Sequence, residues 1–185
     1  MKFELETERL NIRKYKKEDG RDFFDLLERN ENRQYLKDHV DEATTITSLE
    51  ETKTRIEEFI SYWDKKERYI LGIWLKTSGT YIGQLWIEPN KKEVPSFELG
   101  WFLDRLYQGQ GLATEAVKKA IGFLFDELKA HKIIVLVLEN NERSNKLAKR
   151  CGFVKEGLLR DHTVRNGKRI GLNYYGLLKT EYKTD

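Results

Sequence analysis

Apolar and polar residues alternate along several short segments of this chain, and this pattern predicts strands. The predicted strands are rich in β-branched and aromatic residues and are bounded by turn residues; they cover residues 10–13, 69–75, 81–87, 97–103, 132–138, 153–163 and 172–178. The predicted turns lie at Ser78-Gly79, Pro89-Asn90 and Asn166-Gly167. Residues 132–138 form a continuous apolar run, which is typical of a strand buried on both faces.

Other segments place apolar residues three and four positions apart, which predicts amphipathic helices. One such helix ends near Asn30, and the others cover about residues 49–63, 112–128 and 144–150. Asp19 or Asp22 is the expected cap of the first helix, and Thr47-x-x-Glu50 has the spacing of a capping box for the second. The order of these elements predicts an α/β fold in which helices lie on both faces of a mixed central sheet.

The composition indicates one soluble globular domain that spans residues 1–185. Hydrophobic residues make up 39% of the chain, enough for a core, and the 34 basic and 31 acidic residues nearly cancel. No global field therefore draws the chain onto nucleic acid. Residues 1–9 lack the apolar core of a signal peptide and no run approaches the roughly 18 apolar residues of a membrane span, so a cytoplasmic protein is expected. The single cysteine, Cys151, excludes a disulfide framework and is expected to be a core residue; no metal is expected.

A glycine-rich stretch, YQGQGLATEA at residues 107–116, lies between the predicted strand at residues 97–103 and a long helix. A loop that leaves a strand and opens a helix points several backbone N–H groups to one side, and the positive end of the helix dipole adds to them. Gly109 and Gly111 lack the Cβ atoms that would keep a pyrophosphate away. The stretch matches neither a P-loop nor a three-glycine dinucleotide motif. We interpret it as a phosphate-binding loop, and the alternative is a glycine turn before an ordinary helix.

The spacing Gln108-x-x-Gly111-x-Ala113 resembles the Q/R-x-x-G-x-G/A signature of the GNAT superfamily of acyl-CoA-dependent N-acyltransferases. Further motifs resemble its RimJ/RimL-type branch, whose founding members acetylate ribosomal-protein N-termini; they are Glu98-x-Gly100-Trp101, Thr114-Glu115-Ala116, Asn141-x-x-Ser144, Gly152-Phe153-x-x-Glu156-Gly157 and Tyr175-x-Leu177-Leu178. The resemblance implies a largely antiparallel sheet of about seven strands, with a splayed strand pair at the cofactor site. It also implies transfer of an acetyl group from acetyl-CoA to a primary amine, on a protein N-terminus or a small molecule, by direct attack in a ternary complex.

Backbone and side-chain groups from several of these motifs make up the predicted cofactor site. Amides of residues 108–113 would bind the pyrophosphate, and Asn141 would hydrogen-bond the amides of the pantetheine arm. The strand at Gly100 and Trp101 could pair with the same arm. Three basic residues could meet the ribose 3′-phosphate or form a solvated helix face: Lys146, Lys149 and Arg150. The predicted cofactor-binding set is Gly100, Trp101, Gln108, Gly109, Gln110, Gly111, Leu112, Ala113, Thr114, Asn141, Ser144 and Lys146.

Glu98 and Ser144 are the predicted catalytic residues. The resembled superfamily commonly has a tyrosine proton donor at the position that Ala148 occupies here. Ser144 would instead donate to the leaving thiolate, and its alternative role is to cap the helix. Glu98 would act as a base through one water, or remain a solvated glutamate. In one RimL-like arrangement a glutamate occupies the position of Thr163, so this chain departs from that arrangement in its base. The neighbouring His162 could titrate near neutrality, and its alternative is a surface position.

Amine pKa values favour an α-amine as the acceptor. Neutralising a lysine side chain at pH 7 costs about 4.6 kcal/mol, whereas an α-amino group costs about 1 kcal/mol. A site without an obvious strong base therefore suits an N-terminal or small-molecule amine, and residues 32–39 are the segment expected to vary with the acceptor.

Two other functions remain open: a regulatory protein that binds acyl-CoA without transferring it, and a ribosome- or RNA-binding module that uses the basic C-terminal third. The sequence has no RNA-binding motif, so nucleic acid is expected only through a ribosomal substrate. A homodimer agrees with the resembled branch, although no feature of the sequence demands one.

Overall fold

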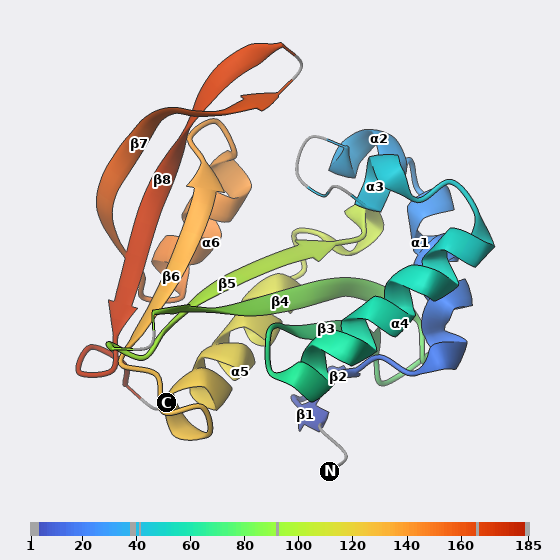
Figure 1. The fold of residues 1–185 in the computed structure, drawn as a ribbon, viewed down its shortest axis with the longest axis horizontal. Helices are drawn as coiled ribbons and strands as arrows, with labels where there is room; N and C mark the ends of the chain where they lie inside the picture. The colour runs from blue at the N-terminus through green and yellow to red at the C-terminus, as the bar shows by residue number, and fades with distance from the viewer. Residues whose placement is uncertain (1–3, 38–39, 41, 92, 166, 184–185) are drawn as a thin grey trace. The chain divides into compact units, whose positions relative to one another are not determined.

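The computed structural model describes residues 4–37, 40, 42–91, 93–165 and 167–183. Within these ranges eight strands form one sheet in the order β1-β2-β3-β4-β5-β6-β8-β7 (Figure 1). The strands are β1 (Glu4–Glu6), β2 (Leu10–Lys14), β3 (Tyr69–Leu75), β4 (Tyr81–Lys91), β5 (Ser96–Leu103), β6 (Lys132–Leu138), β7 (Val154–Arg165) and β8 (Lys168–Leu178). The helices are α1 (Gly20–Glu28), α2 (Asn32–Leu36), α3 (Glu42–Thr45), α4 (Leu49–Lys65), α5 (Leu112–Asp126) and α6 (Glu142–Arg150), with the 3₁₀ turns η1 (Lys17–Asp19) and η2 (Arg105–Tyr107).

The pairing of the strands confirms the predicted mixed, largely antiparallel sheet. Strand β5 is parallel to β6, whereas β1–β2, β2–β3, β6–β8 and β7–β8 are antiparallel pairs. The described residues fall into two compact units. The described residues of Met1–Trp86 and Trp101–Ala116 form unit 1, and those of Ile87–Gly100 and Val117–Asp185 form unit 2.

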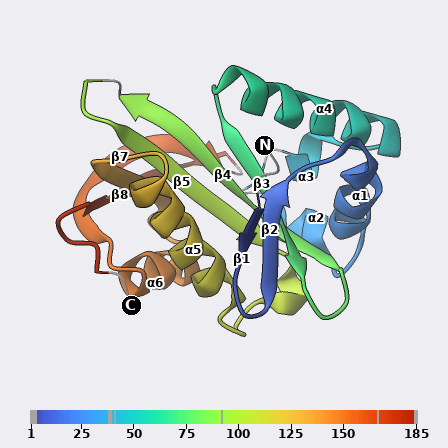
Figure 2. The ribbon, with the colours of Figure 1, turned by 90° about the horizontal axis from the view of Figure 1, so that it is seen from below.

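Aromatic side chains form the core of unit 1. Helices α1 and α4 lie side by side, and α4 packs against β3 (Figure 2). Neighbouring ring centroids in this core lie 5.2 to 6.3 Å apart, and the rings belong to Tyr15, Phe23, Phe59, Trp74, Tyr81 and Phe102. Such pairs contribute about 0.5–1.5 kcal/mol each beyond their buried area, so they account for much of the rigidity of this unit.

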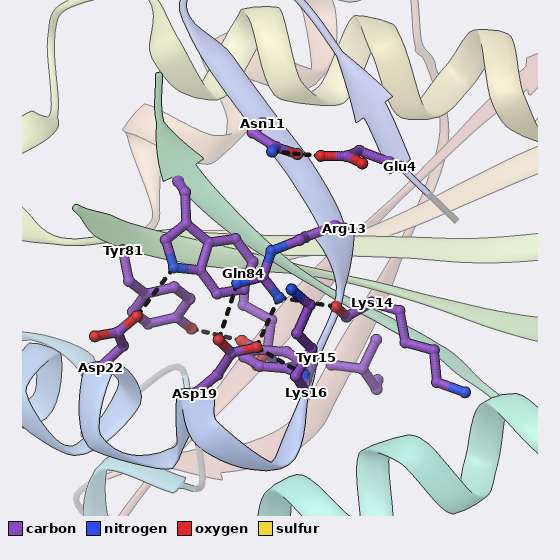
Figure 3. Close-up of polar contacts among 12 residues, drawn as sticks. Glu4, Asn11, Arg13, Lys14, Tyr15, Lys16, Asp19, Asp22, Tyr81 and Gln84 are labelled. Atoms are coloured by element: carbon purple, nitrogen blue, oxygen red, sulfur yellow. Dashed lines mark hydrogen bonds and ion pairs between the residues drawn. The ribbon is translucent and has the colours of Figure 1, made fainter. Parts of the chain in front are cut away.

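A polar cluster borders this core at the start of α1 (Figure 3). The Arg13 guanidinium binds both carboxylate oxygens of Asp19, at 2.7 and 2.9 Å, and lies 3.6 Å from the centroid of the Trp74 ring. The Trp74 indole N–H donates to the Asp22 carboxylate at 3.1 Å. Gly72 leaves room for the indole, because a Cβ atom there would lie 2.3 Å from the ring.

These contacts correct the predicted capping of α1. Asp19 stands at the N-cap position, but its side chain makes no capping hydrogen bond; it accepts from Arg13 and from the backbone N–H of Lys16. Asp22 bonds Trp74 instead. Asp19 is only 6% exposed, so pairing with Arg13 outweighs a cap, because a buried carboxylate without a cationic partner is strongly disfavoured.

Two buried tyrosines form a second hydrogen-bonded group in unit 1. The Tyr15 hydroxyl donates to Gln84 Oε1 at 2.8 Å and shares a 2.6 Å hydrogen bond with the Tyr81 hydroxyl (Figure 3). Burial raises the pKa of both hydroxyls, so both stay protonated at neutral pH. The group therefore satisfies polar atoms inside the aromatic core without placing a charge there.

In unit 2, β6 is paired on both sides. Residues 132–134 pair with β5, and the whole strand pairs with β8. The successive side chains of Ile133, Ile134 and Val135 point to alternate faces and are at most 3% exposed, so both faces of β6 are covered, which explains its unbroken apolar run. Helix α6 packs beside β6, and β7 and β8 form a long hairpin (Figure 1). Two bulges interrupt that hairpin, between Lys155 and Gly157 and between Leu159 and Thr163.

Several predicted boundaries were wrong. The capping box of α4 uses Ser48 and Glu51, one residue later than predicted, because the Glu51 carboxylate accepts from the Ser48 N–H at 3.0 Å. Strand β4 runs through Pro89 and Asn90, where a turn was predicted, since the fixed φ of proline is compatible with extended backbone.

Other differences concern short elements and helix ends. Strand β1 and helices α2 and α3 were not predicted, which brings the sheet to eight strands in the described ranges instead of about seven. Helix α6 begins two residues earlier than predicted, and α5 ends two residues earlier. Asn166 of the last predicted turn, and residues 38 and 39 of the segment expected to vary with the acceptor, lie outside the described residues.

Candidate functional site

The glycine-rich loop lies in unit 1, between the end of β5 and the start of α5. Asp104 follows β5 and accepts a hydrogen bond from the Leu106 N–H at 2.9 Å, which begins η2. Gly109 and Gly111 then have φ values of +77° and +79°, a region where a Cβ atom is strained. A Cβ at Gly109 would meet no atom within 4 Å, and one at Gly111 only the Arg9 guanidinium at 3.5 Å. The glycines therefore fix the path of the loop and leave open space beside it.

The first turn of α5 presents open hydrogen-bond donors. The first hydrogen bond of the helix runs from the Glu115 N–H to the Gly111 carbonyl oxygen at 3.0 Å. Among the residues that the structure describes, the N–H groups of Gly111, Leu112 and Ala113 have no acceptor. Open donors at the positive end of a helix, beside glycines that leave space, suit the oxygens of a phosphate group.

The side chains of two loop glutamines hold the loop itself. Gln108 Nε2 donates to the Leu103 carbonyl oxygen at 3.3 Å, and Gln110 Nε2 donates to the Leu106 carbonyl oxygen at 3.1 Å. Both bonds fasten the loop to the segment that precedes it. The Gln108 N–H donates to the Arg105 carbonyl oxygen at 3.4 Å, so the predicted backbone contact with a pyrophosphate does not extend to Gln108.

Glu115, one turn into α5, anchors the loop to the segment before β2. Its carboxylate accepts from the Thr7 hydroxyl, from the Arg9 N–H at 3.0 Å and from Arg9 Nε at 2.7 Å. Arg9 also donates to the Gln110 carbonyl oxygen at 3.0 Å. Burial alone would raise the pKa of the Glu115 carboxyl, but these hydrogen bonds and the Arg9 charge outweigh burial and lower it. Glu115 is therefore ionised, and Arg9 balances its charge close to the open donors.

Sequence reasoning missed Thr7 and Arg9, which lie about a hundred residues from the loop. It also missed Asp104, whose fully buried carboxylate accepts from Arg29 Nε at 2.7 Å and from Asn30 Nδ2 at 3.1 Å. Charge was the only signal for Arg9 and Asp104, and Thr7 carried none, because nothing in their spacing relates these residues to the glycines. Together they fasten both sides of the loop within unit 1.

In unit 2, Asn141 and Ser144 lie together at the start of α6. Asn141 is the N-cap, and its Oδ1 accepts from the Ser144 N–H at 3.1 Å. Ser144 is thus the third helical residue and not the cap, which was its alternative role. This bond orients the Asn141 side chain, and its two amide N–H groups are the donors that it offers a ligand. The Ser144 side chain is half-buried, and its hydroxyl has no hydrogen-bond partner within the described residues.

The predicted basic residues of α6 lie at the surface of unit 2. Lys146 pairs with Glu142 at 3.3 Å, and both side chains are mostly exposed. Lys149 and Arg150 are exposed as well. An ion pair between two exposed side chains contributes little, so Lys146 remains available to a phosphate.

The remaining predicted residues lie on or next to β5. Its pairing with β6 covers three residues and ends at Glu98 in the described chain, so Gly100 lies beyond the paired stretch. The backbone of Gly100 is consistent with the predicted splayed strand pair, because it makes no ladder contact with β6. Glu98 is half-buried. Trp101 belongs to unit 1, as do residues 108–114.

Other candidate groups have simpler roles. Burial raises the pKa of the Cys151 thiol to about 11, despite the nearby charges of Arg150 and Lys118, so Cys151 is the buried residue that was predicted. His162 is exposed on β7.

Among the described residues no group of three or more His, Cys, Asp or Glu side chains could hold a metal ion. No helix in the described ranges is long and apolar enough to cross a membrane.

Comparison with known proteins agrees with this arrangement. The chain is 30% identical over 178 residues to the uncharacterized N-acetyltransferase p20 of Bacillus licheniformis, which covers 96% of this chain and 97% of that protein. It is 30% identical over 89 residues to the ribosomal-protein-serine acetyltransferase of Escherichia coli, 48% of either chain. RimL, a ribosomal L7/L12 α-N-protein acetyltransferase solved in complex with coenzyme A, has the same fold, with a TM-score of 0.87, 19% identity, and coverage of 95% of this chain and 98% of that one. The sequence model of the acetyltransferase (GNAT) domain matches residues 9–154, and the chain therefore belongs to the GNAT acetyltransferase family.

Proposed function

We propose that the chain, as one acyltransferase domain, transfers the acetyl group of acetyl-CoA to the α-amine of a protein or peptide N-terminus. A small-molecule amine is the second acceptor class. The observation that carries the proposal is the group of open N–H donors at Gly111, Leu112 and Ala113, beside two glycines with positive φ. Diphosphate is the chemical group that such a set of donors binds best.

The loop residues would hold the cofactor through the backbone. The three N–H groups would donate to the diphosphate oxygens, and the start of α5 would add its dipole. Glu115 would repel an anion if it were alone, but its ion pair with Arg9 at 2.6 Å neutralises it. Acetyl-CoA supplies the activated thioester carbonyl, and the chain supplies orientation and proton transfer.

The predicted residues of unit 2 are proposed as further acetyl-CoA contacts because of their sequence motifs. Asn141 would donate its amide N–H groups to the pantetheine arm, and the edge of β5 near Gly100, beyond its ladder with β6, would bond the same arm. Ser144 has a hydroxyl without a partner in the described chain, so it would donate to the thiolate as that group leaves. Glu98 would take the proton of the incoming amine through a water. Lys146 would meet the ribose 3′-phosphate.

The site has no obvious strong base, since Glu98 would reach the amine only through a water, and this supports an acceptor that needs little activation. An α-amine is neutralised at pH 7 for about 1 kcal/mol, against about 4.6 kcal/mol for a lysine side chain. A relative and a structural neighbour are named as acetyltransferases of ribosomal proteins, and the neighbour's name specifies the α-amine. These names favour a polypeptide N-terminus.

Thiol release from acetyl-CoA tests the proposal on pairs of peptides of one sequence, with a free or a formylated N-terminus, each with one internal lysine. We expect kcat/KM to be at least tenfold higher for the free α-amine. Polyamines and aminoglycosides provide the small-molecule arm. Equal rates on free and blocked peptides would overturn the α-amine assignment.

Calorimetry separates the enzyme from the two other functions. We expect acetyl-CoA to bind at both 50 and 300 mM salt, and a generic RNA to lose its affinity at the higher salt. Tight acetyl-CoA binding without thiol release on any amine would indicate a non-catalytic binding protein. Salt-resistant RNA binding without acetyl-CoA binding would indicate a nucleic-acid module.

A further inference from the structure

Asn145 lies at the centre of a hydrogen-bonded network in unit 2. Its Nδ2 donates to the carbonyl oxygens of Leu138 at 3.0 Å and Asn141 at 2.8 Å. Its Oδ1 accepts from Asn173 Nδ2 and from the Tyr175 hydroxyl, both at 2.8 Å. An asparagine amide has two donor hydrogens and two acceptor lone pairs, so its whole capacity is used.

The four bonds join three elements of the fold. Leu138 ends β6, Asn141 caps α6, and the other two partners lie on β8. Strands β6 and β8 pair along the whole of β6, so their positions relative to each other are fixed. Asn145 connects this strand pair to the first turn of α6. Helix α6 therefore cannot rotate about its axis or slide along it without breaking several of these bonds.

Stability alone does not account for this network. Asn173 is 7% exposed, and its Oδ1 has no hydrogen-bond partner within the described residues. A buried acceptor without a donor is destabilising, and apolar side chains of similar size would avoid that penalty. A polar network that leaves one buried atom unsatisfied instead fixes orientation, because its bonds are directional and apolar contacts are not.

The residues on either side of this network are those that the proposed function needs. Asn145 follows Ser144 directly in α6, and its Nδ2 bonds the backbone of Asn141. The Asn141 side chain in turn accepts from the Ser144 backbone. The bonds of Asn145 fix how far helix α6 is rotated about its axis. The directions of the Ser144 hydroxyl and of the Asn141 amide N–H groups therefore depend on Asn145.

We propose that Asn145 is a positioning residue that orients Ser144 and Asn141 toward the thioester arm of acetyl-CoA. This inference rests on the proposed function. Asn145 does not touch the substrate and acts through its two neighbours. Asn173 and Tyr175 serve the same role one step further away.

The test compares Asn145→Leu with the wild type. We expect kcat to fall at least tenfold, the acetyl-CoA dissociation constant by calorimetry to rise at least threefold, and KM for the amine to stay within twofold. Amide hydrogen exchange at Ser144 should become at least tenfold faster, because its bond to Asn141 is no longer held. Tyr175→Phe keeps the ring and loses one bond, so the same changes should appear in weaker form; it also serves if Asn145→Leu does not fold.

Leu147→Ala is the matched control, since Leu147 is a buried residue of α6 that lies outside the network. It should lower Tm at least as much as Asn145→Leu, while kcat and acetyl-CoA affinity stay within twofold of the wild type. Equal losses of kcat in the two variants, or an unchanged kcat in Asn145→Leu, would refute the positioning role. If the wild type releases no thiol with any amine, the proposed function fails. In that case the acetyl-CoA affinity and the hydrogen exchange of the Ser144 amide, compared between Asn145→Leu and the wild type, still decide whether Asn145 orients the first turn of α6.

Discussion

Replacing Gly109 with alanine separates ligand binding by the glycine-rich loop from folding. Gly109 has a φ of +77°, and a Cβ atom there would meet nothing within 4 Å. The folding penalty is therefore at most the left-handed strain, about 1–2 kcal/mol, because the loop can relax to a negative φ in the free protein. A domain with a typical stability of about 5–15 kcal/mol stays folded after that loss.

The binding penalty is larger, because alanine favours a negative φ and turns the loop amides away from a common point. A hydrogen bond to a charged group contributes about 1.5–3 kcal/mol. The loss of one N–H to phosphate bond thus weakens acetyl-CoA binding roughly tenfold to 150-fold. Calorimetry with acetyl-CoA measures the affinity, and urea unfolding measures the stability.

Gly79→Ala provides a matched control. Gly79 lies between β3 and β4 with a φ of +67°, and a Cβ atom there also meets nothing within 4 Å. Both variants should lose similar stability, and only Gly109→Ala should lose acetyl-CoA affinity. An unchanged affinity in Gly109→Ala would refute the assignment of this loop to the diphosphate. Equal losses of affinity in both variants would show that binding merely follows stability.

Glu115→Gln should lower the free energy of unfolding by about 1–2 kcal/mol at pH 7, because it weakens the charge-assisted bonds from Thr7 and Arg9. The folded chain lowers the pKa of Glu115, so the stability difference between the variant and the wild type is present above the ordinary pKa of 4.5 and is lost as the pH falls through the folded-state pKa. An equal stability difference at pH 7 and pH 3 in urea unfolding would contradict this reasoning. Gly72→Ala should destabilise the chain by about 1–3 kcal/mol, because the new Cβ would lie 2.3 Å from the Trp74 ring, and an unchanged Tm would argue against that packing. Cys151 should resist iodoacetamide at pH 8 until urea unfolds the chain, since a thiol pKa of about 11 leaves roughly one thiolate in a thousand; fast labelling of the native protein would disprove its burial.

The sequence alone predicted the parts of the fold that depend on local patterns. The apolar runs of β3 and β6 were predicted with their observed boundaries, because each run ends at clear turn residues or charges. The Ser48–Glu51 capping box was predicted one residue early, because Thr47 and Ser48 are both good caps and only the geometry distinguishes them. Short elements such as β1 were missed, since three residues carry too little periodicity.

The features of the candidate site were likewise predicted only where they depend on local sequence. The glycine-rich loop was predicted from Gly109 and Gly111 because they lack a Cβ atom, whereas their positive φ values emerged only from the structure. The contacts of Thr7 and Arg9 with Glu115 cross about a hundred residues of sequence, so no local pattern could reveal them. Asn141 replaced Ser144 as the cap of α6, because either residue type caps well and the choice depends on where β6 ends.

The proposed acetyl-CoA site depends on one contact, between the N–H groups of Gly111, Leu112 and Ala113 and the diphosphate of coenzyme A. Nuclear magnetic resonance on ¹⁵N-labelled protein, titrated with coenzyme A, measures this contact residue by residue. We predict saturable downfield shifts of these three amide protons, and the same shifts with dephospho-coenzyme A, which keeps the diphosphate and lacks the 3′-phosphate. If coenzyme A binds and these three amides do not move, the diphosphate lies elsewhere and the glycine-rich loop is not its site.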